Sequence, residues 1–145
     1  MIKTIRDNIM TRIGTVLGST YSKLSFSQDV SANKFKQSNK RFSVNVKGSN
    51  AISGAVNSNT YDHSFEIVIT DTYQKGQVLN DDYLHDVICG LQDKAMLIYK
   101  DLQTNKSYLN AKCLIVNSFS MSEPELLEEE KIIVIKFNVN IKYTN

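Results

Sequence analysis

The sequence lacks several residue types that mark small stapled or catalytic domains. It has no tryptophan, one proline, two cysteines and two histidines in 145 residues. Cys89 and Cys113 match no metal or redox spacing, so we expect two reduced core residues rather than a disulfide. His63 and His85 are too few and too far apart for a triad. We expect His63 to be half-buried on a strand, and His85 to form a surface ion pair on a helix.

Neither sign of charge dominates, and no long apolar run is present. The chain has 17 basic and 15 acidic side chains, a net charge of +2, which argues against binding of nucleic acid or membrane by bulk charge. No stretch approaches the roughly 18–20 apolar residues of a membrane span. MIKTIRDNIM carries charges within its first turns, so we expect no signal peptide there and folding in a reducing cytoplasm.

Sequence motifs for phosphate binding, dinucleotide binding, zinc proteolysis, thiol redox chemistry and serine hydrolysis are all missing. We therefore expect no catalytic residue, no cofactor and no metal ion, so the chain is not expected to be an enzyme. Asp71, which ends ITDTY, is better interpreted as a turn residue than as a catalytic carboxylate. A small enzyme stays an alternative only if the fold forms a pocket with convergent polar groups.

The apolar periodicity that is present predicts two helices in one domain, 1–145. A spacing of three and four predicts the first helix over residues 3–17, with Gly18 as its stop. A second, longer helix begins near residue 81. The two apolar stripes consist of Ile2, Ile5, Ile9, Ile13 and Val16, and of Leu84, Ile88, Leu91, Ala95, Ile98 and Leu102.

Alternating apolar residues predict strands at 41–47, at 61–70, around 110–119 and at 131–143. The Gly-, Ser- and Asn-rich segment 48–60 and the segment 27–40 are expected to be mobile loops. Helices and strands do not alternate singly, which indicates an α+β fold. We expect an antiparallel sheet of four or more strands with both helices on one face, in the order αββαββ.

The strand at 131–143, KIIVIKFNVNIKY, is unusually long, because strands commonly have about 5–6 residues. Its odd positions are all apolar from Ile133 to Tyr143, so that face can lie against the helices. Segment 111–119 can pair with only about nine of its residues. We expect the remainder to offer an unpaired edge to another chain, unless residues 22–26 cover it.

Two charge clusters have open interpretations. Residues 34–41, KFKQSNKR, could contact phosphates through Lys34, Lys36, Lys40 and Arg41 while Phe35 stacks on a base, or could be a solvated loop. Residues 123–130, EPELLEEE, are either a charged turn or, in a ring of copies, a negative wall past which DNA slides.

A short N-terminal helix, a strand pair with a long loop, FEIVITDTY before a long helix, and two closing long strands resemble the tail-terminator proteins of long-tailed bacteriophages. The head–tail joining proteins of the same phages are similar. The resemblance covers almost the whole chain and lies in element order, size and strand style. The composition, rich in Asn, Lys, Ser and Ile, also fits an AT-rich phage genome.

The resemblance implies a virion protein of the tail or neck, assembled in the host cytoplasm. It implies a hexameric ring that caps the tail tube, stops polymerisation of the tube protein and joins the neck or connector. Genomic DNA would pass through the lumen without specific binding. Head completion or head–tail joining in the same virion is the alternative role, and a nucleic-acid-binding module using residues 34–41 is a second.

The residues themselves suggest three contact surfaces for such a ring. The candidate subunit interface is Ile133, Ile135, Phe137, Val139, Ile141, Tyr143, Phe42, Val44 and Val46. The candidate contact loop for tube or neck is Asn50, Ile52, Val56 and Asn57. The candidate lumen-facing turn is Glu123, Glu125, Glu128, Glu129 and Glu130.

Overall fold

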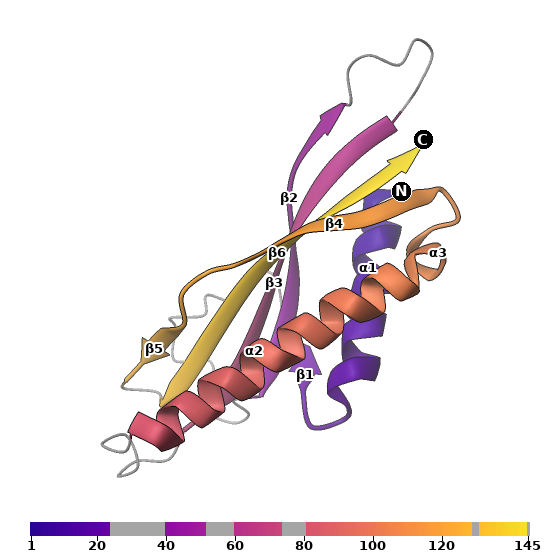
Figure 1. The fold of residues 1–145 in the computed structure, drawn as a ribbon. Helices are drawn as coiled ribbons and strands as arrows, with labels where there is room; N and C mark the ends of the chain where they lie inside the picture. The colour runs from indigo at the N-terminus through magenta and orange to yellow at the C-terminus, as the bar shows by residue number, and fades with distance from the viewer. Residues whose placement is uncertain (24–39, 52–59, 74–80, 129–130, 145) are drawn as a thin grey trace.

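A computed structural model describes residues 1–23, 40–51, 60–73, 81–128 and 131–144 of the chain. The elements are α1 (Ile2–Leu17), β1 (Ser22–Lys23), β2 (Arg41–Ala51), β3 (Thr60–Thr72), α2 (Asp81–Thr104), α3 (Lys106–Leu109), β4 (Cys113–Met121), β5 (Glu125–Leu127) and β6 (Ile132–Thr144) (Figure 1). The predicted α+β class is confirmed. The short elements β1, α3 and β5 are additions to the predicted order.

The strands form one sheet in the order β1-β2-β3-β6-β4, with β5 also paired to β6. All pairs are antiparallel except β1 with β2, which are parallel, so the sheet is mixed rather than wholly antiparallel. None of the described helices is long and apolar enough to cross a bilayer.

Both long helices cover the same face of this sheet, as predicted. Helix α1 ends at Leu17, just before Gly18, whose φ of 85° lies in the left-handed region that favours glycine. The predicted stripes of α1 and α2 pack into one core with the odd-numbered residues of β3 and β6. A second, smaller cluster on the other face contains Val68, Ile132 and Val134, with Leu127 of β5 packed against it.

The long strand β6 lies inside the sheet, so the predicted unpaired edge at 131–143 is wrong. Strand β3 extends from Thr60 to Thr72 and pairs with β6 along its whole length, from Thr144 to Ile132. Strands β4 and β5 pair with the other edge of β6. The prediction failed because it paired β6 with segment 111–119 alone and placed no strand on its second edge. Segment 22–26 does not cover β6, because Ser22 and Lys23 pair with β2.

The predicted loop at 48–60 is wrong at both ends. Residues 48–51 continue β2, and Thr60 already begins β3. A β-bulge between Val46 and Ser49 shifts the register there, so the polar, glycine-containing sequence stays in the ladder. Residues 52–59, and most of the predicted loop 27–40, lie outside the described residues.

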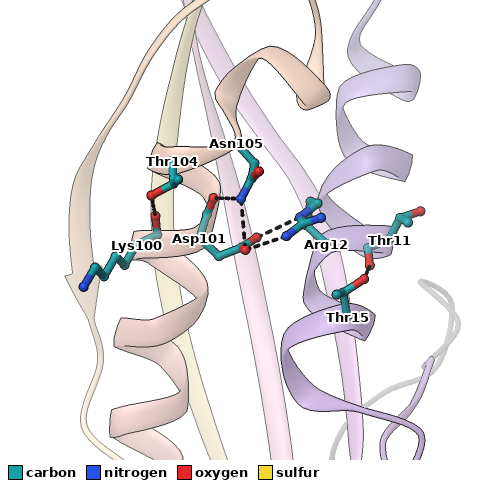
Figure 2. A network of polar contacts seen from close by, with 7 residues as sticks. All are labelled: Thr11, Arg12, Thr15, Lys100, Asp101, Thr104 and Asn105. Atoms are coloured by element: carbon teal, nitrogen blue, oxygen red, sulfur yellow. Dashed lines mark hydrogen bonds and ion pairs between the residues drawn. The ribbon is translucent and has the colours of Figure 1, made fainter.

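A bidentate ion pair joins α1 to α2 (Figure 2). The guanidinium of Arg12 donates to both carboxylate oxygens of Asp101, at 2.9 and 2.6 Å. Asn105 Nδ2 donates to the same carboxylate at 3.1 Å. Both side chains of the pair are less than a quarter exposed, and the hydrogen bond to Asp101 raises the pKa of Arg12. The two helices are therefore fixed relative to each other above the sheet.

Candidate interaction surface

Most of the predicted subunit interface is the core of a single chain. The six odd-numbered side chains of β6 are 0–5% exposed, and Phe42 and Val44 are 2% and 0% exposed. These eight side chains cannot reach another subunit, so the interface predicted there is wrong. The same periodicity predicted that the odd-numbered face of β6 lies against the helices, and that prediction is confirmed. Val46 differs, because its side chain is 38% exposed.

The β2 edge of the sheet is partly occupied. Strand β1 pairs with Arg41 and Phe42, and Arg6 Nε of α1 donates to the Val44 carbonyl at 3.2 Å. Within the described ranges, no strand pairs with β2 on this side beyond Phe42. The exposed part of the edge therefore begins near Val46, at the bulge.

The opposite edge, formed by β4, is occupied by side chains of the helical layer. Gln103 Nε2 of α2 donates to the Val116 carbonyl at 3.3 Å, and Lys106 Nζ of α3 donates to the Leu114 carbonyl at 2.9 Å. Two register shifts interrupt the β4–β6 ladder, and Ser118 at the second has a φ of 60°. Bulges and occupied carbonyls are devices that keep an edge strand from pairing with other chains.

An exposed apolar surface lies between α2 and the strands β4 and β5. One open hollow, of about 750 Å³, has Met96, Leu97, Tyr99 and Phe119 among its lining residues. A second hollow, of about 420 Å³, continues along α2 and is lined by residues that include Cys89, Glu123, Pro124 and Leu126. We call the two hollows together the α2 groove.

The α2 groove has the features of an interaction surface. Met96 and Leu97 are 58% and 57% exposed, high for apolar side chains. Tyr99 stacks on Phe119 at 5.0 Å between ring centroids, so the floor is preorganised. Sequence reasoning missed this surface because it followed only the core stripe of α2. The signal was present, since Met96 and Leu97 are apolar but lie off that stripe.

The acidic turn is partly described. Glu123, Glu125 and Glu128 are exposed, and Glu125 approaches Lys136 at 4.0 Å. Glu129 and Glu130 lie outside the described residues, as do Ile52, Val56 and Asn57 of the predicted contact loop. Asn50 pairs with Asp62 in the β2–β3 ladder, so its backbone belongs to a strand and not to the predicted loop.

The titratable residues that sequence reasoning singled out are not brought together. His63 is 7% exposed beside Phe65, more buried than expected, and burial lowers its pKa. His85 is exposed and lines the α2 groove. Asp71 accepts a hydrogen bond from Tyr21 Oη at 3.4 Å and approaches Lys40 Nζ at 3.8 Å. In the described part of the chain, no three His, Cys, Asp or Glu residues could hold a metal ion.

The basic cluster at 34–41 is described only at Lys40 and Arg41. Lys40 approaches Asp71 and also lies over the Tyr21 ring, 5.8 Å from its centroid. Arg41 is half-buried and pairs through its backbone with Thr70 of β3. These two residues therefore have partners within the fold, and the predicted phosphate contacts of Lys34, Lys36 and Phe35 lie outside the described residues.

Comparison with known proteins gives a structural likeness alone. No family model matches the chain, and no curated protein matches it. Among solved structures, a chain of the "Virion of native gene transfer agent (GTA) particle" has a similar fold, with a TM-score of 0.52 and 7% sequence identity. The match covers 97% of this chain and 94% of that chain. This protein therefore shares its fold, over nearly its full length, with a chain of a gene transfer agent virion.

Proposed function

We propose that this chain is a structural protein of a phage-like virion. The observation that carries the proposal is the fold shared over 97% of its length with a chain of a gene transfer agent virion. Functions are carried by sites more than by folds, so a virion role also requires a surface that can bind partners. The α2 groove adds support, because an assembly protein needs exposed apolar surface for its partners.

Within the virion we propose the role of tail terminator. Copies of the chain would form a ring, six in number by resemblance, on the end of the tail tube. The ring would bind the tail tube protein, halt its polymerisation and present its other side to the neck or connector protein, while genomic DNA passes through the lumen. Such a role requires surfaces and no catalytic group, in keeping with the absence of recognisable catalytic motifs in the sequence. We accordingly propose that the chain is not an enzyme.

The test is to disrupt the gene for this protein in the genome that produces the particles, and to examine the tails by electron microscopy. Loss of a terminator leaves tubes of irregular length. Loss of a head-completion or joining protein, the alternative role, leaves tails of normal length that are detached from heads. Complete, infectious particles without the protein would refute both roles.

A second measurement uses purified components. Added to polymerising tail tube protein, a terminator should stop growth at substoichiometric amounts and appear as a cap on tube ends. Bovine serum albumin at the same concentration serves as the control. Tube lengths that do not depend on the added protein, with no cap in images, would contradict the terminator role.

A further inference from the structure

The side of α2 that lies opposite its core stripe carries a sequence pattern that is symmetric about its middle. Asp93 comes three residues before Met96, and Lys100 comes three residues after Leu97. Residues three, four and seven apart share one face of a helix, so these four side chains lie together, and all four are exposed. The face therefore has two apolar side chains at its centre, with an acidic residue on one side and a basic residue on the other.

Neither of these two charged side chains has an ion-pair partner among the residues that the structure describes. Asp93 and Lys100 cannot satisfy each other, because seven residues of helix separate them by about 10 Å along the axis. Other exposed charges are paired within the chain, as Lys3 is with Asp7 at 2.6 Å. Asp93 and Lys100 are therefore available to a partner molecule.

The apolar centre of this face stands between two hollows. Met96 and Leu97 line the larger hollow of the α2 groove together with Phe119 of β4. Leu97 also lines a hollow of about 370 Å³ on the other side of the helix, where Val16 of α1 is among the lining residues. A ridge of apolar side chains with a hollow on each side can pack against a second ridge of the same shape.

We propose that two copies of this chain associate through α2, with the two helices antiparallel about a two-fold axis between positions 96 and 97. Met96 and Leu97 of one copy then pack against the same two side chains of the other copy. Asp93 of each copy lies opposite Lys100 of the other, so the symmetry forms two ion pairs. Farther from the axis, the exposed Cys89 faces the exposed Thr104 of the other copy, which opposes no like charges.

The order of the charges selects this antiparallel arrangement. In a parallel pair, Asp93 would lie against Asp93 of the other copy and Lys100 against Lys100, and both contacts would repel. An antiparallel two-fold contact is isologous and closes at two copies, whereas a ring requires a heterologous contact. The dimer is therefore a contact additional to the ring proposed above, and neither requires the other.

Reversal of the two charges tests the dimer. Lys100→Asp and Asp93→Lys each replace both ion pairs with repulsive pairs, so each variant should weaken dimerisation about tenfold in dissociation constant, measured by sedimentation velocity at low salt. The two substitutions change the net charge in opposite directions, so a common loss cannot come from net charge. The variant with both changes restores opposite charges across the axis and should dimerise like the wild type, as should an equimolar mixture of the single variants.

A charge at the apolar centre tests the packing. Leu97→Asp should weaken dimerisation at least a hundredfold, because the substitution acts twice across the axis. Leu97 is 57% exposed in one chain, so the melting temperature of the monomer should stay near that of the wild type. The control is Val46→Asp, at an exposed apolar residue of β2, which should dimerise like the wild type.

Cross-linking tests the direction of the two helices. Cys89 is exposed and free, and a short-spacer bismaleimide should link it to an introduced Thr104→Cys of the other copy, giving a covalent dimer. Within one chain the two positions are fifteen residues apart, about 22 Å along the helix, which is too far for the reagent. The wild type should not be linked, because the axis also separates the two copies of Cys89 by about 22 Å.

Several results would overturn the dimer. They are a wild type that stays monomeric at the highest concentration attainable, single reversals that leave the dissociation constant unchanged, and a double variant that is no tighter than the single variants. A ladder of larger oligomers from Thr104→Cys would also overturn it, since a ladder requires a heterologous contact. If the wild type is monomeric and Leu97→Asp is lost from particles, this face binds another virion protein and not a second copy. The tail morphology that tests the terminator role is independent of all these results.

Discussion

A substitution at Phe137 tests whether β6 belongs to the core of the chain or to a subunit interface. Its side chain is 0% exposed, and its ring centroid lies 5.5 Å from that of Phe119. Phe137→Ala removes the ring from a packed core and leaves a cavity, which typically costs about 3–5 kcal/mol. Whole domains have a free energy of unfolding of only about 5–15 kcal/mol, so the expected loss is a large share of it.

The measurements are urea unfolding and thermal unfolding of the monomer, each followed by circular dichroism. Each kcal/mol corresponds to roughly 3 °C of melting temperature in a chain of this size, so the melting temperature should fall by about 10 °C or more. Leu97→Ala is the matched control, because Leu97 is apolar but 57% exposed. Its free energy of unfolding should stay within about 0.5 kcal/mol of the wild type.

The opposite pattern would refute the placement of β6. If β6 lined a subunit interface, Phe137→Ala would leave monomer stability within about 1 kcal/mol of the wild type, as surface substitutions do. It would then weaken self-association instead. The denaturant slope should be unchanged in both variants, since a changed slope signals an altered unfolded state.

Three further predictions concern other parts of the fold. Burial lowers the pKa of His63, so its contribution to stability is complete above the ordinary value of about 6.5 and declines as the pH falls below it. The free energy of unfolding of His63→Phe, measured in urea titrations, should therefore rise relative to that of the wild type as the pH is lowered from 7.5 to 5.5. A difference between the two proteins that is the same at both pH values contradicts this. Maleimide should label Cys89 in the native protein and Cys113 only on unfolding, because Cys113 is 7% exposed and burial raises its pKa; equal labelling rates would refute it. Arg12→Gln and Asp101→Asn should each lower the melting temperature, and the double variant should lower it by less than the sum. Strictly additive shifts would mean that the two side chains are not coupled.

Local periodicity predicted much of this fold. The stripes of α1 and α2, the stop at Gly18 and the odd face of β6 all follow from residues a few positions apart, because one face of each element is buried. These signals require no knowledge of which strands are neighbours.

Strand neighbours were harder to predict, because pairing joins residues far apart in the sequence. The partner of Tyr143 in β3 is Tyr61, and alternation alone does not identify it. The strand β2 also continues through Gly48 and Ser49, where composition favoured a loop and the bulge absorbs the mismatch. The α2 groove depends on what α2 leaves uncovered, which requires the positions of β4 and β5.

The hydrogen bonds from Gln103 and Lys106 to the carbonyls of β4 have an evolutionary consequence. Two exposed side chains of the helical layer, outside the hydrophobic core, occupy carbonyl groups that β4 could otherwise offer to another chain. The substitution Gln103→Leu would keep α2 intact but would remove the hydrogen bond to the carbonyl of Val116. Pairing of the β4 edge with other chains would then become accessible to a sequence whose folded stability had scarcely changed, so selection should act on these positions through aggregation and not through unfolding.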